Sequence, residues 1–207
     1  MNGAYVIRYN NTMLSLLVRT LFNTVAPGGV IGPHANHDKE LMDAGIKPVT
    51  LMGSFEGLNV SEDSNPMILK WEREYHEMAE MAENGDLLRM DFTVQDEEGN
   101  DVNFTLFGQH GEENAMNDIV NAYEYEFGVE GAEPPERDMG LNLGYSEADV
   151  RLWNVMNAVM RYAPFLGDAV NNYMQEINVP RQQANIQRML SEADNAGARP
   201  TEPHQPV

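Results

Sequence analysis

Histidine is the side chain most often used for acid–base catalysis and metal binding near neutral pH, and the chain contains five histidines. The segment from His76 to Glu80 begins like the helical zinc-protease motif H-E-x-x-H. Its fifth position is a glutamate, so the second imidazole ligand is missing. On a helix, His76 would lie one turn from both Glu72 and Glu80. We therefore interpret it as a solvent-exposed histidine that pairs with these carboxylates.

A second cluster of potential ligands follows a glycine-rich loop. His34, His37 and Asp38 lie within five residues of one another and offer two imidazoles and a carboxylate to a divalent metal ion. A further ligand would have to come from a residue such as Glu40 or Asp43. One hypothesis is therefore a metal-dependent hydrolase. The alternative is a loop that leads into the first turn of a helix.

The other motifs of enzyme chemistry are incomplete. Ser54 directly follows Gly53, whereas the nucleophile elbow G-x-S-x-G requires the serine at its centre. The glycines of residues 27–32 follow a predicted helix, whereas phosphate-binding loops follow a strand. The acidic turn at 96–101 lacks the alternating ligands and the distal glutamate of an EF-hand. We therefore expect no cofactor and no enzymatic activity.

The elements that carry these residues belong to a chain of globular composition, with 207 residues of which 42% are hydrophobic and 22% charged. Thirteen Lys and Arg face 33 Asp and Glu, which gives a net charge of −20. Residues 49–131 hold 3 basic and 20 acidic side chains, so most of the excess falls there. Because this charge repels phosphate and anionic lipid, we expect no direct nucleic-acid binding and no membrane association.

Localisation signals are weak. The most hydrophobic stretch near the N-terminus, residues 13–25, is interrupted by Arg19, and no small-residue cleavage site follows it. The chain contains no cysteine and no apolar run of the roughly 18 residues that a membrane span needs. We expect a protein of the cytoplasm or of a virion that is not secreted through a signal peptide.

The hydrophobic pattern predicts an α+β protein. Asn65 and Pro66 are typical of a helix start, and residues 88–106 alternate like a hairpin with one buried face. A last short strand is expected at 139–143. An antiparallel sheet with packed helices follows, and its order allows a split βαβ, ferredoxin-like arrangement. The expected elements are strands at 4–9, 47–53, 88–95 and 102–106, and helices at 11–25, 37–44, 66–84 and 113–127.

The C-terminal part has a different composition and predicts a helical appendage. Ser146 and Asp149 resemble a capping box at the start of a helix that ends before Pro164. Two further helices are expected on either side of a break at 178–180. The predicted segments are 1–46, packing on the core; 47–131, the acidic core; 132–144, a linker; 145–194, the helical unit; and 195–207, a flexible tail.

Two surfaces are candidates for binding a partner. Ile186, Met189 and Leu190 form a narrow apolar stripe on a helix too short to be stable alone. A second group of acidic residues lies near the C-terminal end of the 66–84 helix, where the helix dipole disfavours negative charge. This group consists of Glu77, Glu80 and Glu83.

From these features we expect a non-enzymatic, acidic protein-interaction module. It would bind a protein partner or a copy of itself, as an accessory or structural subunit of a larger assembly such as a virion. The first alternative is an inhibitor that mimics nucleic acid and occupies the groove of a basic DNA-binding protein. The second is the metal-dependent hydrolase that uses His34, His37 and Asp38.

Overall fold

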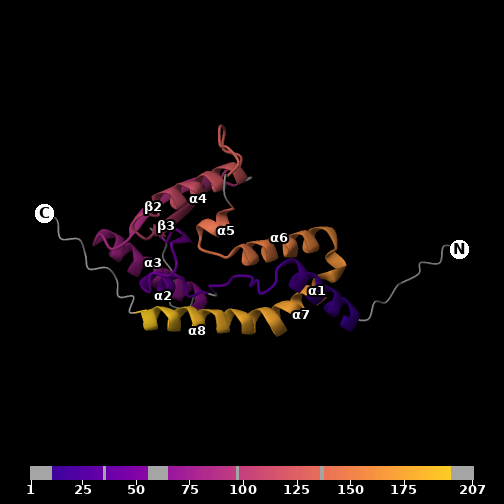
Figure 1. The fold of residues 1–207 in the computed structure, drawn as a ribbon. Helices are drawn as coiled ribbons and strands as arrows, with labels where there is room; N and C mark the ends of the chain where they lie inside the picture. The colour runs from indigo at the N-terminus through magenta and orange to yellow at the C-terminus, as the bar shows by residue number, and fades with distance from the viewer. Residues whose placement is uncertain (1–10, 35, 56–64, 97, 136–137, 197–207) are drawn as a thin grey trace. The chain divides into compact units, whose positions relative to one another are not determined.

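The computed structural model of the chain describes residues 11–34, 36–55, 65–96, 98–135 and 138–196 (Figure 1). The chain divides into two compact units. We call the first, residues 1–35 with 145–188, the helical unit, and the second, residues 36–144 with 189–207, the acidic unit. The strand predicted at 4–9 and most of the predicted tail lie outside the described residues.

The acidic unit contains the β-sheet, and the expected α+β class is confirmed. The long helix α3 begins as predicted, since the side chain of Asn65 accepts a hydrogen bond from the backbone N–H of Met67 (2.9 Å). The elements are α2 (Asp38–Asp43), β1 (Val49–Gly53), α3 (Pro66–Glu83), β2 (Leu88–Gln95), β3 (Asp101–Gly108), α4 (Glu113–Glu126) and α5 (Met139–Asn142).

The sheet has the strand order β1-β3-β2, and β3 is antiparallel to both of its neighbours. Strands β1 and β2 are therefore parallel to each other, joined through α3 and separated by β3. This is the split βαβ unit that the element order allows. The predicted hairpin is confirmed, with Leu88 opposite Gly108 and Gln95 opposite Asp101.

Helices cover both faces of this sheet. Neighbouring residues of a strand point to opposite faces, so successive residues of β3 contact different helices. Leu106 of β3 packs in a cluster with Met116 and Ile119 of α4. The next residue, Phe107, packs with Tyr75 of α3. Figure 1 shows β2 and β3 between these two helices. The expectation of a hairpin with only one buried face was therefore wrong.

The last predicted strand was also wrong, because residues 139–142 form the short helix α5. Asp138 caps this helix by accepting a hydrogen bond from the backbone N–H of Gly140 (2.8 Å). The apolar residues Met139 and Leu143 are one helical turn apart, and both pack against the α4 side of the sheet. The ferredoxin-like arrangement thus lacks its fourth strand among the described residues.

The described residues of the helical unit form helices and connecting loops. The predicted capping box is confirmed: Ser146 and Asp149 bond reciprocally at the start of α6. The helices are α1 (Asn11–Val25), α6 (Glu147–Tyr162), the 3-10 turn η1 (Pro164–Leu166), α7 (Gly167–Tyr173), the π-helical turn η2 (Met174–Asn178) and α8 (Val179–Ala196), the last of which extends into the residues of the acidic unit.

The core of the helical unit joins residues from the two ends of its sequence. Val18 and Phe22 of α1 are fully buried in a cluster with Leu152 of α6 and Tyr173 of α7. The rings of Phe22 and Tyr173 meet edge to face, with centroids 4.9 Å apart. The sequence placed α1 on the acidic core, but its buried residues belong to this helical cluster.

The break expected at 178–180 is absent, because η2 leads directly into α8. Pro180, the second residue of α8, has no backbone N–H to donate, and the π-helical turn η2 directly precedes it. The side chain of Asn178 accepts a hydrogen bond from the backbone N–H of Ile31 (2.8 Å) and donates one to the Ile31 carbonyl (2.9 Å). None of the helices in the described ranges is both long and apolar enough to span a bilayer.

Candidate functional site

The predicted metal ligand His34 lies in the helical unit and is only 3% exposed. Its ring contacts that of Tyr145 edge to face, with centroids 4.8 Å apart. This contact lies next to the start of α6, where Ser146 opens the helix. His34 is therefore packed against an aromatic ring within its own unit.

The other two residues of the predicted metal site have protein partners. Nδ1 of His37 lies 2.6 Å from Oε2 of Glu40, one turn further along. Oδ1 of Asp38 lies 2.9 Å from Nζ of Lys47. In the part of the chain that the structure describes, no three His, Asp or Glu side chains lie close enough to hold a metal ion. The predicted trio is not assembled into a metal site.

The Asp38–Lys47 ion pair is buried on the lysine side, where the Lys47 side chain is 2% exposed. Burial lowers the pKa of Lys47, and the neighbouring Asp38 carboxylate opposes this shift. Nζ also lies 3.4 Å from the backbone carbonyl of Leu143. The pair therefore joins the start of α2 to the segment before β1 and to the end of α5.

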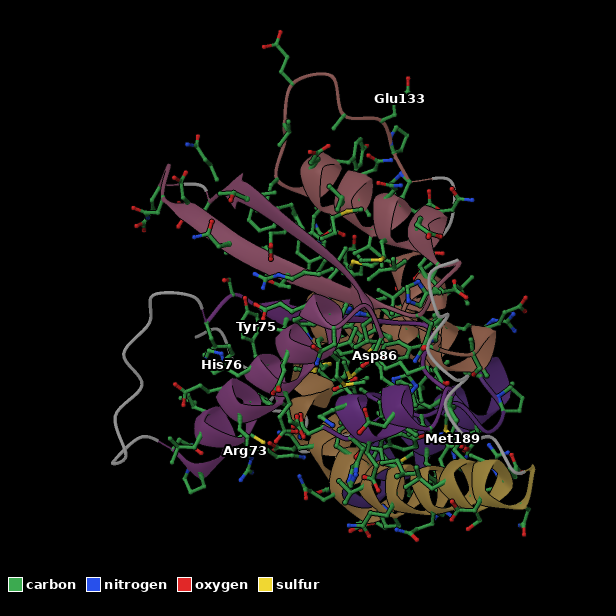
Figure 2. All side chains as sticks on the ribbon, turned by 90° about the vertical axis from the view of Figure 1, so that its left-hand side faces the viewer. Arg73, Tyr75, His76, Asp86, Glu133 and Met189 are labelled. Carbon is green, nitrogen blue, oxygen red and sulfur yellow. The ribbon has the colours of Figure 1, made fainter. Side chains whose placement is uncertain are left out.

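The acidic residues predicted to bind a partner lie on α3, as expected. Glu77, Glu80 and Glu83 are all exposed. Glu77 forms an ion pair with Lys39, at an N···O distance of 3.4 Å. His76 is exposed on the same helix, and its ring contacts the ring of Tyr75 edge to face (Figure 2).

The apolar stripe predicted on α8 is only partly available to a partner. Ile186 is 2% exposed, so the chain itself already covers its side chain. Met189, labelled on α8 in Figure 2, and Leu190 are half-buried. A partner could therefore contact Met189 and Leu190 without rearrangement of the chain, but not Ile186.

A cavity of about 450 Å³ lies in the acidic unit beside β1, and the sequence analysis did not find it. It lies between the strand, the start of α2 and the helix α3. On the α3 side, the cavity wall contains Trp71, which is 39% exposed, and Glu74. The complete lining is Asn36, Asp38, Thr50, Leu51, Met52, Gly53, Ser54, Phe55, Trp71 and Glu74.

The floor of this cavity is connected to the sheet through hydroxyl groups. Tyr75 on α3 is 1% exposed, and its hydroxyl lies 3.4 Å from Oγ of Ser54 and 3.2 Å from Oγ1 of Thr105 (Figure 2). Thr105 in turn donates a hydrogen bond to Asp91 (2.6 Å). Arg89 donates to both the Tyr75 hydroxyl and the Asp91 carboxylate. This network fixes α3 against the sheet and holds the cavity wall in place.

Two polar groups of the cavity lining are buried without enough hydrogen bonds or opposite charge to compensate for the loss of water. Thr50 is 2% exposed, and its Oγ1 has no hydrogen-bond partner among the described residues. Burial raises the pKa of Glu74, and Lys70, at an N···O distance of 3.4 Å, opposes that shift only in part. Both observations indicate a site that a polar ligand atom would stabilise.

The helical unit exposes an apolar surface that the sequence analysis also missed. Helix α1 buries Val18 and Phe22 on one side, but leaves large apolar side chains in solvent on the other. At about 100° per residue these side chains form one continuous stripe. We call this set the α1 stripe: Met13 (66% exposed), Leu16 (63%), Leu17 (56%) and Leu21 (37%). The signal was in the sequence, since the helix is apolar on both sides.

Comparison with models of known protein families, with curated proteins and with solved structures found no match.

Proposed function

We propose that this chain is a non-enzymatic protein-interaction module, an accessory or structural subunit of a larger assembly in the cytoplasm or in a virion. The observation that carries the proposal is the α1 stripe. An apolar helix face is normally buried against another element. The described residues cover only one side of α1, so the other side is suited to contact with another protein.

A binding role also agrees with the partners of the residues that sequence analysis offered for catalysis. The His34 ring contacts that of Tyr145 edge to face, His37 bonds to Glu40, and Asp38 pairs with a buried lysine. Each of these contacts has an ordinary structural purpose. The apolar contact surface, which the sequence located on α8, is better placed on α1, because Ile186 is already covered.

The experiment uses the full chain and a double variant, Leu16→Glu with Leu17→Glu. Both side chains are exposed, so the thermal midpoint should stay nearly unchanged while two buried charges would prevent contact with a partner. Arg19→Glu is the matched control, since it places the same acidic group on an exposed position of α1 outside the stripe.

The readouts are light scattering of the purified chain and mass spectrometry of proteins that co-purify from the native source. Association that is present in the wild type and in Arg19→Glu, but absent in the double variant, supports the proposal. A wild-type chain that runs as a monomer and co-purifies with nothing would overturn it.

A second candidate function rests on a different observation, the charge of the acidic unit. That unit holds 7 basic and 29 acidic residues, a net charge of −22, and Glu80 and Glu83 are exposed on α3. Such a surface could occupy the groove of a basic DNA-binding protein. This role requires that the purified chain displaces duplex DNA from such a protein and that high salt abolishes the displacement.

A further inference from the structure

Within the described ranges, β1 has a strand partner on one side only, and its outer edge has none. The carbonyl of Pro48 accepts a hydrogen bond from the N–H of Gln109, and the N–H of Ser54 donates one to the carbonyl of Asn103, both at 2.9 Å. In an antiparallel pair, alternate residues bond to the partner strand. The backbone N–H and C=O groups of Thr50 and Met52 therefore point toward β3. The backbone groups of Leu51 and Gly53 point to the opposite side. No other strand of the described residues pairs there.

The cavity follows the same edge. Thr50 and Met52 face the α3 side of the sheet, since their partners in β3 are Phe107 and Thr105. Trp71 and Glu74 form the wall of the cavity on that side. A strand added along β1 would send every second side chain toward α3. One such side chain would enter the cavity.

The lining defines the chemistry of that side chain. The Trp71 ring offers an apolar surface suited to an aliphatic stem or to a cation above the ring. The lining also contains the Glu74 carboxylate, which can accept hydrogen bonds and attracts a cation. An apolar stem with a cationic end, as in arginine or lysine, satisfies these groups together.

The charge of the whole unit favours the same partner. Its 29 acidic side chains outnumber its basic ones by 22, so it attracts basic segments and repels acidic ones, including a second copy of itself. A partner strand with several lysines or arginines would gain from this field. An acidic strand of the same length would lose.

We propose that the open edge of β1 binds an extended, basic segment of a partner protein by strand addition, with one arginine or lysine side chain in the cavity between Trp71 and Glu74. This is a second binding surface, separate from the α1 stripe. The backbone of Leu51 and Gly53 supplies the hydrogen bonds, and the cavity selects the side chain.

The test uses the full-length chain with Trp153→Phe, which leaves Trp71 as the only tryptophan. The probe is the peptide Thr-Val-Arg-Val-Arg-Val-Thr, and binding is followed by Trp71 fluorescence. Two matched peptides serve as controls: one has Glu in place of both Arg residues, and one carries N-methyl groups on alternate peptide bonds. We expect binding of the Arg peptide only, weakened by salt.

Three variants locate the contact. Glu74→Gln should weaken binding about tenfold or more, because it removes a charge-assisted hydrogen bond. Glu80→Gln, the same change on an exposed residue of α3 outside the cavity, should leave affinity unchanged. Gly53→Pro removes an outward N–H and no bond to β3, so it should abolish binding while circular dichroism and the thermal midpoint persist.

Equal binding of the Arg and Glu peptides, or full binding of the N-methylated peptide, would overturn the proposal. Full affinity of Gly53→Pro would do the same. Self-association of the free chain that Gly53→Pro abolishes would assign the edge to a second copy instead. Loss of association in the α1 double variant would not affect peptide binding, so the two proposals can fail independently.

Discussion

The two units of this chain differ more from each other than the total composition suggests. The helical unit holds 6 basic and 4 acidic residues, a net charge of +2, whereas the acidic unit has a net charge of −22. The nearly neutral unit exposes the α1 stripe, and the acidic unit exposes a sheet edge beside a cavity. The exposed apolar surface and the excess of acidic charge therefore lie in different parts of one molecule.

The contacts that stabilise each unit internally also differ between the two units. In the acidic unit, the β2–β3 hairpin and its two flanking helices join residues that are near one another in sequence. In the helical unit, polar contacts join distant segments: Asp149 accepts a bond from the N–H of Val30 (2.7 Å), and Gln182 donates to the carbonyl of Ile31 (2.6 Å). The helical unit thus depends on contacts between segments that are far apart in the sequence.

The largest losses of stability should come from replacing a large buried side chain in the core of each unit by alanine. Phe22→Ala in the helical unit and Phe107→Ala in the acidic unit should each lower the free energy of unfolding by about 3–5 kcal/mol, since both rings are fully buried. Each unit carries one of the two tryptophans, Trp153 and Trp71 respectively. Urea unfolding can therefore be followed for each unit in single-tryptophan backgrounds.

In these backgrounds, Phe22→Ala should lower the midpoint reported by Trp153 more than that reported by Trp71, and Phe107→Ala should do the reverse. Equal shifts at both tryptophans would contradict the comparison and would mean that the two cores unfold as one cooperative body.

A smaller effect is expected from a close backbone approach in the helical unit. A Cβ added at Gly29 would lie 2.5 Å from the carbonyl oxygen of Ala148 in α6. Because a helix backbone cannot yield easily, Gly29→Ala should cost about 1–3 kcal/mol in thermal or urea unfolding. Gly53→Ala in the acidic unit is the control, since no atom lies within 4 Å of its added Cβ. A neutral Gly29→Ala would mean that α6 is free to move.

The next largest losses of stability should come from removing the side-chain hydrogen bonds at the start of α6. Ser146→Ala removes one half of the capping box and should cost about 0.5–2 kcal/mol. Asp149→Ala also leaves the N–H of Val30 without its acceptor, so it should cost more than Ser146→Ala does. The comparison of the two thermal midpoints is the measurement. Equal losses would show that the Val30 contact contributes nothing.

The smallest effect concerns Glu74 in the cavity. Because burial raises its pKa, the native state binds a proton more tightly than the unfolded chain does, and stability from this group falls as pH rises through the raised pKa. Glu74→Gln should therefore raise the free energy of unfolding at pH 7 by less than about 1 kcal/mol. The gain should vanish below about pH 4, where both states are protonated. A gain that is equal at all pH values would exclude titration of Glu74 as its cause.

Local signals explain what the sequence could predict. The Asn65 cap, the Ser146 capping box and the β2–β3 hairpin each depend on residues within a few positions, and all were confirmed. Residues 139–143 were ambiguous, because spacing of two and spacing of four both fit their apolar residues. Capping by Asp138 decided in favour of a helix.

The site depended on information that is not local. The open edge of β1 follows from strand order, and the cavity requires α2, β1 and α3 together. The contact between Asn178 and Ile31 joins residues 147 positions apart, so no short window of sequence contains it. His34, His37 and Asp38 are neighbours in the sequence, yet each has a different partner in the fold.

The order in which a ribosome makes this chain has a consequence for α1. Phe22 packs on Tyr173, but the whole of residues 36–144 is synthesised between them. At a synthesis rate of about 5–20 residues per second, roughly 8 to 30 seconds pass between the synthesis of Phe22 and that of Tyr173. During this interval both apolar sides of the helix are exposed, while the hairpin of the acidic unit can already fold. The apolar residues of α1 are therefore made well before the residues of α6 and α7 that complete their core.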